Sequence, residues 1–294
     1  MFCIVADIGA TNIRLLSSVD FVFEKDLINK YKFIERNDIN DEVDRCLCDR
    51  IDELIKNHGV PDAICLSFPG NTDSEGTVLT WPNRQKWNSF KLRKYLSDKY
   101  KCKVIIEDDA NCAAWGEYNV LSLNTRNMAC ITLGSGIGCG LILNGSIYKG
   151  DNGCAGELGH MYIGSGEKCT CGNNGCVQII AGGKAIEMKY GKTFTEISND
   201  ECYSDIRQNI VMSISKAIYN LVMLLDIKTI VIGGGISNDA LVNELNKQTD
   251  NMLDKFKRNV IIKKCLYGDD SGLYGALMIL KEYFQYHKND KKEG

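Results

Sequence analysis

The segment FCIVADIGATNIRLL, residues 2–16, gives the first indication of the fold. Phe2–Ala6 is apolar and contains β-branched residues, Asp7–Asn12 contains a glycine, and the apolar pattern resumes at Ile13. Buried strands are rich in such residues and glycine permits a tight turn, so the segment predicts a strand, a glycine turn and a second strand. The exposed amides of such a turn suit phosphate oxygens, although an ordinary hairpin turn has the same pattern.

A second glycine-rich segment repeats this arrangement further along the chain. Met128–Leu133 predicts a strand, Gly134–Gly140 is rich in glycine, and Leu141–Tyr148 predicts a hairpin that turns at Asn144–Gly145. A dinucleotide-binding fingerprint requires a helix directly after the glycines, so this segment is not a Rossmann site, and the chain around Gly183–Lys184 lacks the P-loop spacing. Two such hairpins predict two related α/β halves with a cleft between them; a coincidence of two glycine hairpins is the alternative.

Strands and helices alternate along the chain, which predicts an α/β protein with helices on the faces of mixed sheets. The apolar spacing predicts helices at residues 38–58, 89–100, 111–121, 205–225, after 235 and from 272. It predicts further strands at residues 63–68, 104–106, 229–232 and 260–263, and a loop over 150–183. We expect a smaller N-terminal domain at 1–115, completed by a C-terminal helix at 280–294, and a larger domain at 116–279 that carries a loop at 160–176.

The composition is that of an ordinary globular chain, with 294 residues, 44% hydrophobic residues and 25% charged residues. The net charge of −3 provides no positive field to hold nucleic acid or an anionic membrane, so a small-molecule partner is expected. The N-terminus, MFCIVADIG, lacks the basic and apolar regions of a signal peptide. No later stretch approaches the roughly 18 apolar residues that a membrane span needs. We therefore expect a cytoplasmic protein.

Fourteen cysteines do not form a disulfide framework in a reducing compartment. Most are scattered, and Cys3, Cys65, Cys130 and Cys139 fall in strand-like runs. Free cysteine is among the most buried residue types, so these side chains are predicted to be core thiols.

Three cysteines are clustered instead, with the spacing C-x-C-x4-C at Cys169, Cys171 and Cys176. His160, one of only three histidines, lies nine residues before the first of them. Three thiolates and one imidazole are the four ligands of a closed tetrahedral zinc site. A site with no open coordination position is structural, so this zinc would orient the loop and the nearby Glu157.

Two further segments lie where a strand leads into a helix. The run Glu107–Asn111 contains adjacent carboxylates, which serve there either as helix caps or, because neighbouring acids repel and raise one pKa, as a base for a hydroxyl group. The run Val231–Ser237 contains three glycines, whose flat backbone can pack against an adenine or ribose or can form an ordinary turn.

Taken together and in this order, these segments resemble the ROK family of sugar kinases, within the actin-like ATPase superfamily, from Asp7 to Gly235. GELGH at 156–160 and CTCGNNGC at 169–176 are the most specific pieces. The resemblance is supported by DIGATN, EDDANCAAWGE, LGSGIGCGLILNGSIYKG, VIGGGIS and the WPN segment with Trp87. It implies a two-domain actin-like ATPase (ribonuclease H-like) fold and in-line transfer of the γ-phosphoryl group of ATP to a sugar hydroxyl.

The resemblance also implies a role for each matching residue. Asp109 would be the base that takes the proton from the attacked hydroxyl. The residues that would bind the sugar are Asn83, Asp108, Asp109, Glu157, His160 and Gln178. The residues that would bind ATP, with Asp7 near Mg²⁺, are Asp7, Gly9, Thr11, Asn12, Gly134, Ser135, Gly136, Gly233, Gly234 and Gly235. The ligands of a structural Zn²⁺ would be His160, Cys169, Cys171 and Cys176.

Two residues depart from the family pattern, so the pattern does not determine which sugar is the substrate. Asp108 stands where the family commonly has Asn, and Gln178 stands where it commonly has Glu. The formal charge of the sugar pocket is kept while a donor and an acceptor change places, and such changes alter which hydroxyls a pocket accepts. We expect glucose or a related aldohexose, phosphorylated at O6, with allose, fructose, N-acetylmannosamine and N-acetylglucosamine as alternatives.

Other functions compete with a kinase. A sugar-responsive repressor would carry a helix-turn-helix domain ahead of the core, whereas the first hairpin here already begins at Asp7. A catalytically silent sugar- or nucleotide-binding module predicts ATP binding without turnover. A kinase of the acetate or glycerol type lacks the cysteine loop. Because family members are often dimers or tetramers, the resemblance implies a homodimer or homotetramer.

Overall fold

The computed structural model of the chain describes residues 1–9, 12–32, 40–81, 84–121, 125–164 and 166–290. These residues form two compact units, each with a five-stranded sheet. Unit 1 comprises Met1–Asn119 and Asp270–Gly294, and unit 2 comprises Val120–Asp269. The division therefore falls at Asn119, where the sequence predicts residue 115, and the returning segment starts at Asp270, where it predicts residue 280.

The sheet of unit 1 has the strand order β3-β2-β1-β4-β7. Its strands are β1 (Phe2–Ile8), β2 (Asn12–Val19), β3 (Asn29–Lys32), β4 (Ala63–Phe68) and β7 (Lys103–Asp108). The strand, turn and strand predicted for residues 2–16 are present as the antiparallel pair of β1 and β2. Strands β4 and β7 then add in parallel, which places Asp7, Ser67 and Glu107 side by side at the carboxyl ends of three strands.

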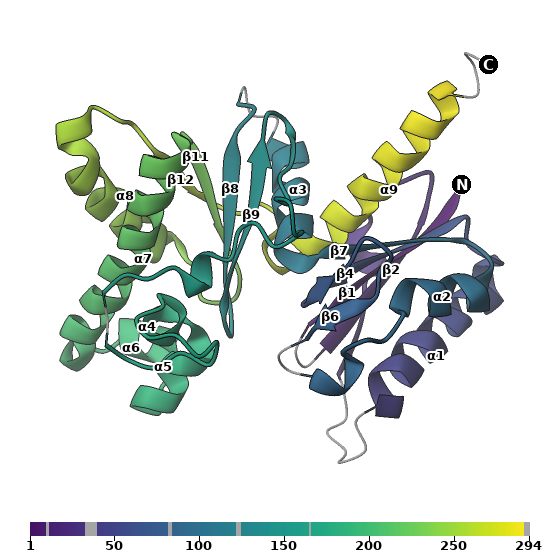
Figure 1. The fold of residues 1–294 in the computed structure, drawn as a ribbon, viewed down its shortest axis with the longest axis horizontal. Helices are drawn as coiled ribbons and strands as arrows, with labels where there is room; N and C mark the ends of the chain where they lie inside the picture. The colour runs from purple at the N-terminus through teal and green to yellow at the C-terminus, as the bar shows by residue number, and fades with distance from the viewer. Residues whose placement is uncertain (10–11, 33–39, 82–83, 122–124, 165, 291–294) are drawn as a thin grey trace. The chain divides into compact units, whose positions relative to one another are not determined.

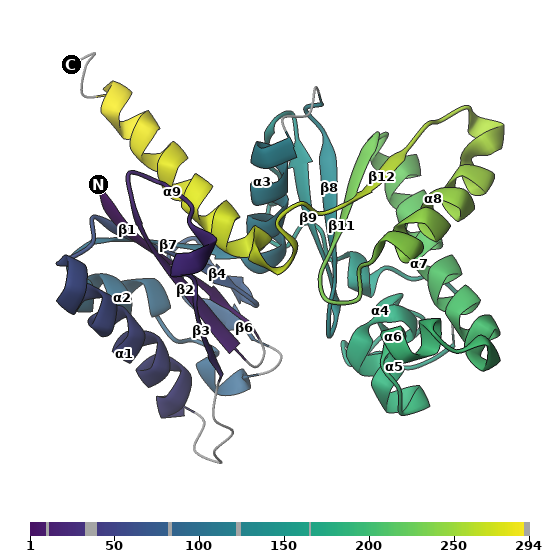
Figure 2. The same ribbon diagram turned by 180° about the vertical axis from the view of Figure 1, so that it is seen from behind.

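Helices cover both faces of this sheet (Figures 1 and 2). Helices α1 and α2 lie on one face and α9 runs across the other, where it contacts β1 and β4. The helices of unit 1 are α1 (Asn40–His58), α2 (Leu92–Tyr100), α3 (Asp109–Leu121) and α9 (Ser271–Asp290), with short 3-10 turns at η1 (Lys25–Leu27) and η2 (Gln85–Trp87). A small ribbon of β5 (Asn71–Thr72) and β6 (Val78–Thr80) borders a cluster of aromatic rings, in which Trp81 packs edge-on against Phe68 and Trp87.

Helices α3 and α9 cross closely within unit 1. A Cβ atom on Gly275 would lie 1.7 Å from the carbonyl oxygen of Cys112, so the two backbones meet without side chains between them. Beside this crossing, the buried Ser271 hydroxyl donates to the Glu117 carboxylate at 2.5 Å. This contact explains why the C-terminal segment joins unit 1 from its first turn onward.

The sheet of unit 2 has the order β10-β9-β8-β11-β12. Its strands are β8 (Met128–Leu133), β9 (Ile137–Leu143), β10 (Ser146–Ile147), β11 (Thr229–Gly233) and β12 (Ile261–Lys264). Strands β8 and β9 form the second predicted hairpin, and β11 and β12 add in parallel. The predicted turn at Asn144–Gly145 has positive φ angles at both residues, 57° and 83°, which suits this dipeptide.

The segment predicted as a loop over residues 150–183 contains short helices in the structure. The helical elements of unit 2 are η3 (Leu158–His160), α4 (Gln178–Ala181), α5 (Gly183–Tyr190), α6 (Phe194–Ser198), η4 (Glu201–Tyr203), α7 (Ser204–Leu225), α8 (Asp239–Leu253), η5 (Asp254–Phe256) and η6 (Gly268–Asp270), the last of which ends in unit 1. Helices α7 and α8 lie together on one face of the sheet, and their apolar side chains complete the core with β8 and β11 (Figure 1).

Among the described residues, one stretch, Glu201–Leu225, is long and apolar enough to span a membrane. The expectation that no segment approaches this length is therefore wrong. Half of the stretch is buried, and Ile210, Ile214, Ile218 and Leu221 belong to the core of unit 2. These side chains are apolar because they pack against the sheet, so the helix serves as a core helix of this unit.

Candidate active site and metal centre

The carboxyl end of β1 holds a partly buried ion pair. Asp7 accepts two hydrogen bonds from Arg14 through Oδ2, at 2.5 and 3.2 Å, and one from the Ser67 hydroxyl through Oδ1, at 2.6 Å. Arg14 also donates to Asp270 at 3.2 Å. No sequence motif marks Arg14 or Ser67 as a site residue, although the register of the hairpin pairs Arg14 with Asp7.

The turn of the first hairpin is closed by a hydrogen bond from the Gly9 amide to the Asn12 carbonyl at 2.8 Å. Asn12 is the first residue of β2. Two of the predicted ligand-binding residues, Thr11 and Asn83, lie outside the described residues. Of the phosphate-binding residues expected here, the structure therefore places Asp7, Gly9 and Asn12 in one hairpin.

The three adjacent acids at the start of α3 occupy different environments. Glu107 is 7% exposed, and its carboxylate accepts from the Asn111 side chain at 3.0 Å and from the Asp108 amide at 3.3 Å. Asp108 accepts from the Asn111 amide at 3.0 Å, which is the hydrogen bond of a helix N-cap. Because Asp108 caps the helix, α3 starts at Asp109, two residues before the predicted start. Asp109 therefore lies at the positive end of the helix dipole.

Two glycine loops of unit 2 meet at the end of β8. The first, Gly134–Gly136, is closed by a hydrogen bond from the Gly134 amide to the Gly136 carbonyl at 3.0 Å. The amides of Ser135 and Gly136 donate to no group in the described part of the chain, and Ser135 is exposed. These donors are available to phosphate oxygens. We call residues 134–136, which the sequence predicts to bind phosphate, the phosphate loop.

The second loop, Gly233–Gly235, packs directly against the same strand. Gly234 has a φ of 86°, and a Cβ atom there would lie 2.4 Å from the Leu133 carbonyl oxygen, so only glycine fits. The Ile236 amide donates to that carbonyl at 3.0 Å. The structure thus brings together two of the predicted nucleotide-binding segments that are about a hundred residues apart in the sequence.

The turn that carries Glu157 and His160 packs on β9. Gly156 has a φ of 100°, and a Cβ atom there would lie 2.0 Å from the Cys139 carbonyl oxygen. This close approach leaves the Glu157 side chain exposed at the start of η3, while Leu158 is buried. Glu157 is thus free of the core and able to reach a polar ligand.

Gln178, the third predicted sugar-binding residue of unit 2, has a partner that the sequence does not reveal. Its side-chain Oε1 accepts from the Ile137 amide at 3.1 Å, at the first residue of β9. The side chain therefore contacts the end of the phosphate loop.

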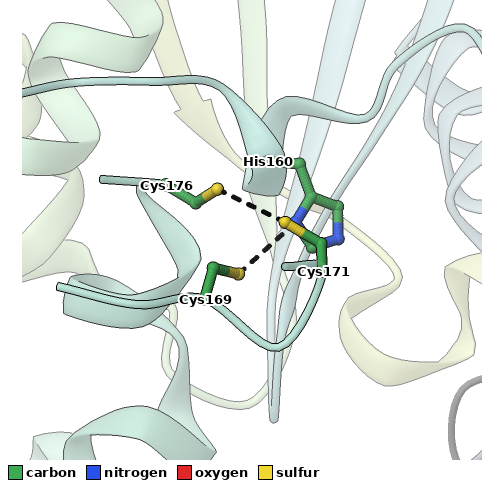
Figure 3. Close-up of side chains that lie close together, drawn as sticks. All are labelled: His160, Cys169, Cys171 and Cys176. Carbon is green, nitrogen blue, oxygen red and sulfur yellow. Dashed lines mark hydrogen bonds between the residues drawn. The ribbon is translucent and has the colours of Figure 1, made fainter. Parts of the chain in front are cut away.

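The four predicted metal ligands lie together in unit 2 (Figure 3). One ligand atom from each of His160, Cys169, Cys171 and Cys176 lies within 4.8 Å of all the others. The nearest pairs are Cys169 Sγ with His160 Nδ1 and Cys171 Sγ with Cys176 Sγ, each at 3.7 Å. Such separations suit atoms arranged around one tetrahedral ion. Glycines at 172 and 175, with φ angles of 95° and 76°, make the turns between the cysteines.

The thiols of this group differ in their acidity. The amide of Asn173 lowers the pKa of the exposed Cys171 by hydrogen bonding to its sulfur, whereas burial raises the pKa of Cys176 to about 12. A bound cation reverses that burial effect by favouring the thiolate. Three sulfurs and one imidazole nitrogen are the donor set preferred by zinc, so the residues fit the expected ion.

The sequence also predicts four core thiols in strands, and the structure buries all four without a disulfide bond: Cys3, Cys65, Cys130 and Cys139. That prediction is confirmed.

The fold is shared with solved structures. The ROK hexokinase from Thermus thermophilus superposes with a TM-score of 0.80 and 24% identity, over 96% of this chain and 100% of that chain. The chain therefore has the α/β fold of the actin-like ATPases, as its resemblance implies.

Sequence comparison identifies the family within this fold. The ROK family model matches residues 3–283. An N-acetylmannosamine kinase of Vibrio cholerae is 32% identical over 96% of this chain and 100% of its own length. An N-acetyl-D-glucosamine kinase of Histophilus somni is 28% identical over 92% of this chain and 96% of its own length. The chain belongs to the ROK family, and these relatives, which match nearly its whole length, are sugar kinases.

Proposed function

We propose that this ROK sugar kinase transfers the γ-phosphoryl group of ATP to the O6 hydroxyl of an aldohexose or of its 2-acetamido derivative. N-acetylmannosamine is the first substrate to test, because the relative at 32% identity is a kinase of that sugar. The observation that carries the proposal is the arrangement of the three acids at the start of α3. Glu107 and Asp108 bind Asn111 at the helix terminus. Asp109 is the first residue of α3, where the positive end of the helix dipole favours its ionised, basic form.

Asp109 would act as general base. In that role its carboxylate takes the proton of the attacked hydroxyl while the hydroxyl oxygen bonds to the γ-phosphorus and the bond to ADP breaks. General-base catalysis contributes typically about 10²- to 10⁴-fold to the rate. Glu157, His160 and Asp108 keep their predicted roles as sugar-binding residues. Asn83 keeps its predicted role as well.

The phosphates of ATP would bind to the amides of Ser135 and Gly136 and to the first hairpin, including Gly9, Thr11 and Asn12. The loop Gly233–Gly235 would pack against the nucleoside. When bound, Mg²⁺ neutralises phosphate charge. Asp7 would hold that ion through its water shell, because its oxygens already accept hydrogen bonds from Arg14 and Ser67.

The metal centre would hold a structural Zn²⁺. His160 and the three cysteines supply all four ligands, so the ion would have no open coordination position for a substrate. His160 lies in the same short turn as Glu157. A fixed imidazole would therefore set the position of the Glu157 side chain.

A coupled assay of ADP formation tests the activity, with N-acetylmannosamine, N-acetylglucosamine, glucose, allose and fructose offered in turn. We expect one of these sugars to be phosphorylated, and we expect Asp109→Asn to lower kcat by about 10²- to 10⁴-fold with ADP binding unchanged. Asp151→Asn, which removes an exposed acid of unit 2, is the matched control and should keep full activity.

Two outcomes would contradict the proposal. ADP binding without turnover of any sugar would make the chain a nucleotide-binding module. Near-normal turnover by Asp109→Asn, with the control also active, would remove Asp109 from its role as base.

A further inference from the structure

Gln178 connects the segment that carries the metal ligands to the loop that would bind the phosphates of ATP. It is the first residue of α4 and follows Cys176, a residue of the metal centre, by two positions. Its side chain points back to β9, where Oε1 accepts the Ile137 amide at 3.1 Å. Ile137 directly follows the phosphate loop, so one side chain joins the loop that carries the metal ligands to the loop assigned to phosphate. We call residues 160–176 the metal loop.

Two glycines make room for this side chain. A Cβ atom on Gly136 would lie 3.0 Å from the Gln178 Oε1 atom, and one on Gly159 would lie 2.8 Å from it. Real Cβ atoms essentially never show the contact of 2.8 Å, and the contact of 3.0 Å is tighter than nine in ten of those they do show. Gly136 belongs to the phosphate loop and Gly159 directly precedes His160. The amide oxygen is therefore enclosed by the same two segments that it connects.

The segment that follows Gln178 also binds the phosphate loop. The Gly183 amide donates to the Gly134 carbonyl and the Lys184 amide donates to the Ser135 carbonyl, each at 2.9 Å. With the bond to Gln178, three hydrogen bonds fix the backbone on both sides of Ser135 and Gly136. These bonds leave the Ser135 and Gly136 amides as donors, so the position of α4 and α5 determines where those donors point.

The metal loop is in turn tied to the start of α4. The Val177 amide donates to the Met161 carbonyl at 3.1 Å, and the Ile163 amide donates to the Gly175 carbonyl at 2.9 Å. His160 and Cys176 lie on these two paired segments, and their ligand atoms belong to the same group. An ion bound to both side chains would fix the position of the backbone that leads from Cys176 to Gln178.

We propose that Gln178 is a positioning residue that couples the metal loop to the phosphate loop, so that Zn²⁺ at the metal centre strengthens the binding of nucleotide phosphates. This inference rests on the proposed assignment of the phosphate loop. The neutral amide suits this position, because it accepts the Ile137 hydrogen bond without placing a negative charge beside the amides that receive phosphate.

The coupling is reciprocal. If Zn²⁺ raises the affinity for ADP by a given factor, ADP raises the affinity for Zn²⁺ by the same factor. Since Gln178 contributes one of the three hydrogen bonds that hold the phosphate loop, we expect about a 5-fold effect, at the lower end of the range for coupled sites.

Calorimetric titration of ADP with Mg²⁺ measures the effect without turnover. The proteins are the wild type and Gln178→Leu, each with Zn²⁺ and after chelation. The matched control is Asn220→Leu, whose amide contacts Met161 Sδ at the metal loop and lies outside the phosphate loop. In the wild type and the control, chelation should weaken ADP binding about 5-fold. Gln178→Leu should bind ADP about 5-fold more weakly with Zn²⁺ present, and chelation should then change little.

Gln178→Glu keeps an acceptor for the Ile137 amide. It should retain the dependence on Zn²⁺ while binding ADP more weakly because of its charge. Competition with a chromophoric chelator then measures the reciprocal effect: ADP should raise the Zn²⁺ affinity of the wild type about 5-fold and leave that of Gln178→Leu unchanged. This second measurement decides the question even where the chelated chain does not stay folded.

The proposal is overturned if Gln178→Leu binds ADP as tightly as the wild type, or if chelation weakens ADP binding equally in both. A loss of sugar affinity alone would make Gln178 a sugar-binding residue instead. Failure of the proposed function is a separate outcome, since it would appear as the absence of sugar phosphorylation with the ADP and Zn²⁺ coupling intact.

Discussion

The two hairpins, β1–β2 in unit 1 and β8–β9 in unit 2, have the same place in two sheets of the same topology, but they are stabilised differently. In the first hairpin, Asp7 and Arg14 form an ion pair across the two strands. In the second, the facing positions are Thr132 and Gly138, which carry no charge. The loop of the second hairpin is held from outside, by Gln178 and the backbone of α5.

This difference shows that one topology can hold a ligand-binding turn in two ways. The ion pair that supports the first hairpin lies within that hairpin. The loop of the second hairpin is held instead by Gln178, Gly183 and Lys184, which follow the metal loop in the sequence. Changes to the metal centre should therefore affect one hairpin and not the other. Four changes to the chain or its conditions distinguish the support of the first hairpin and its sheet from that of the second.

Removal of Zn²⁺ should have the largest effect and should act on unit 2. With free Zn²⁺ at about 1,000 times its dissociation constant, binding to the folded state contributes about 4 kcal/mol of stability. Thermal unfolding with and without a chelator measures this contribution, and hydrogen exchange locates it. Exchange should accelerate in residues 134–137 and 157–178 and stay unchanged at the β1–β2 hairpin. Equal acceleration at both hairpins would contradict the separation.

Removal of the ion pair should affect unit 1. Asp7 and Arg14 are 13% and 16% exposed, so Arg14→Met leaves a largely buried carboxylate without its cation. We expect a loss of about 3 kcal/mol in the free energy of unfolding, at the lower end for buried pairs. Arg126→Met, which removes an exposed arginine of unit 2 that donates to the Asn144 carbonyl, is the control and should change the value by less than about 0.5 kcal/mol. Denaturant unfolding measures both; equal values would show that the pair adds no stability.

A methyl group at Gly159 should disturb the second hairpin. Its Cβ atom would lie 2.4 Å from the Ile137 carbonyl oxygen, so Gly159→Ala should cost about 2 kcal/mol of stability through overpacking. The control is Gly166→Ala in the metal loop, where a Cβ atom has no neighbour within 4 Å, and this variant should be nearly neutral. The two variants are compared by denaturant unfolding in the presence of Zn²⁺, and similar stabilities would mean that the turn relaxes at no cost.

The smallest effect concerns a thiol of unit 1. Burial, with a contribution from the charge of Asp62, raises the pKa of Cys3 from its ordinary 9.0 to about 12. Because the folded-state pKa is raised, the stabilising contribution of the neutral thiol is fully present below pH 9 and is lost as the pH rises toward 12. The stability of the wild type relative to Cys3→Ala should therefore fall by about 1.4 kcal/mol between pH 8 and pH 10. Urea unfolding at the two pH values measures the difference, and a constant difference would exclude this shift.

Much of the fold could be predicted because its signals are local. Strands at 63–68 and 128–133 and the Asn144–Gly145 turn follow from a few consecutive residues, and the structure has them at the predicted positions. The grouping of His160 with the three cysteines could be predicted for the same reason, since the three cysteines lie in one short loop. Short elements with weak periodicity, β3, the β5–β6 ribbon, α5 and α6, were missed because tertiary packing decides them.

Partners that are distant in the sequence could not be predicted. Arg14 pairs with Asp270, 256 residues later, and Gln178 pairs with the Ile137 amide, 41 residues earlier. No local pattern marks either contact. The roles of Thr11 and Asn83 and the expected homodimer or homotetramer stay predictions.

The crossing of α3 and α9 has a consequence for protein engineering. Because Glu117 and Ser271 are hydrogen-bonded, the chain leaves unit 1 and returns to it at neighbouring points. Unit 2 is thus an insertion into a nearly continuous unit 1. A short glycine-rich connection from Asn119 to Asp270 would close unit 1 into a single chain, and the same junction would accept a different insert in place of unit 2.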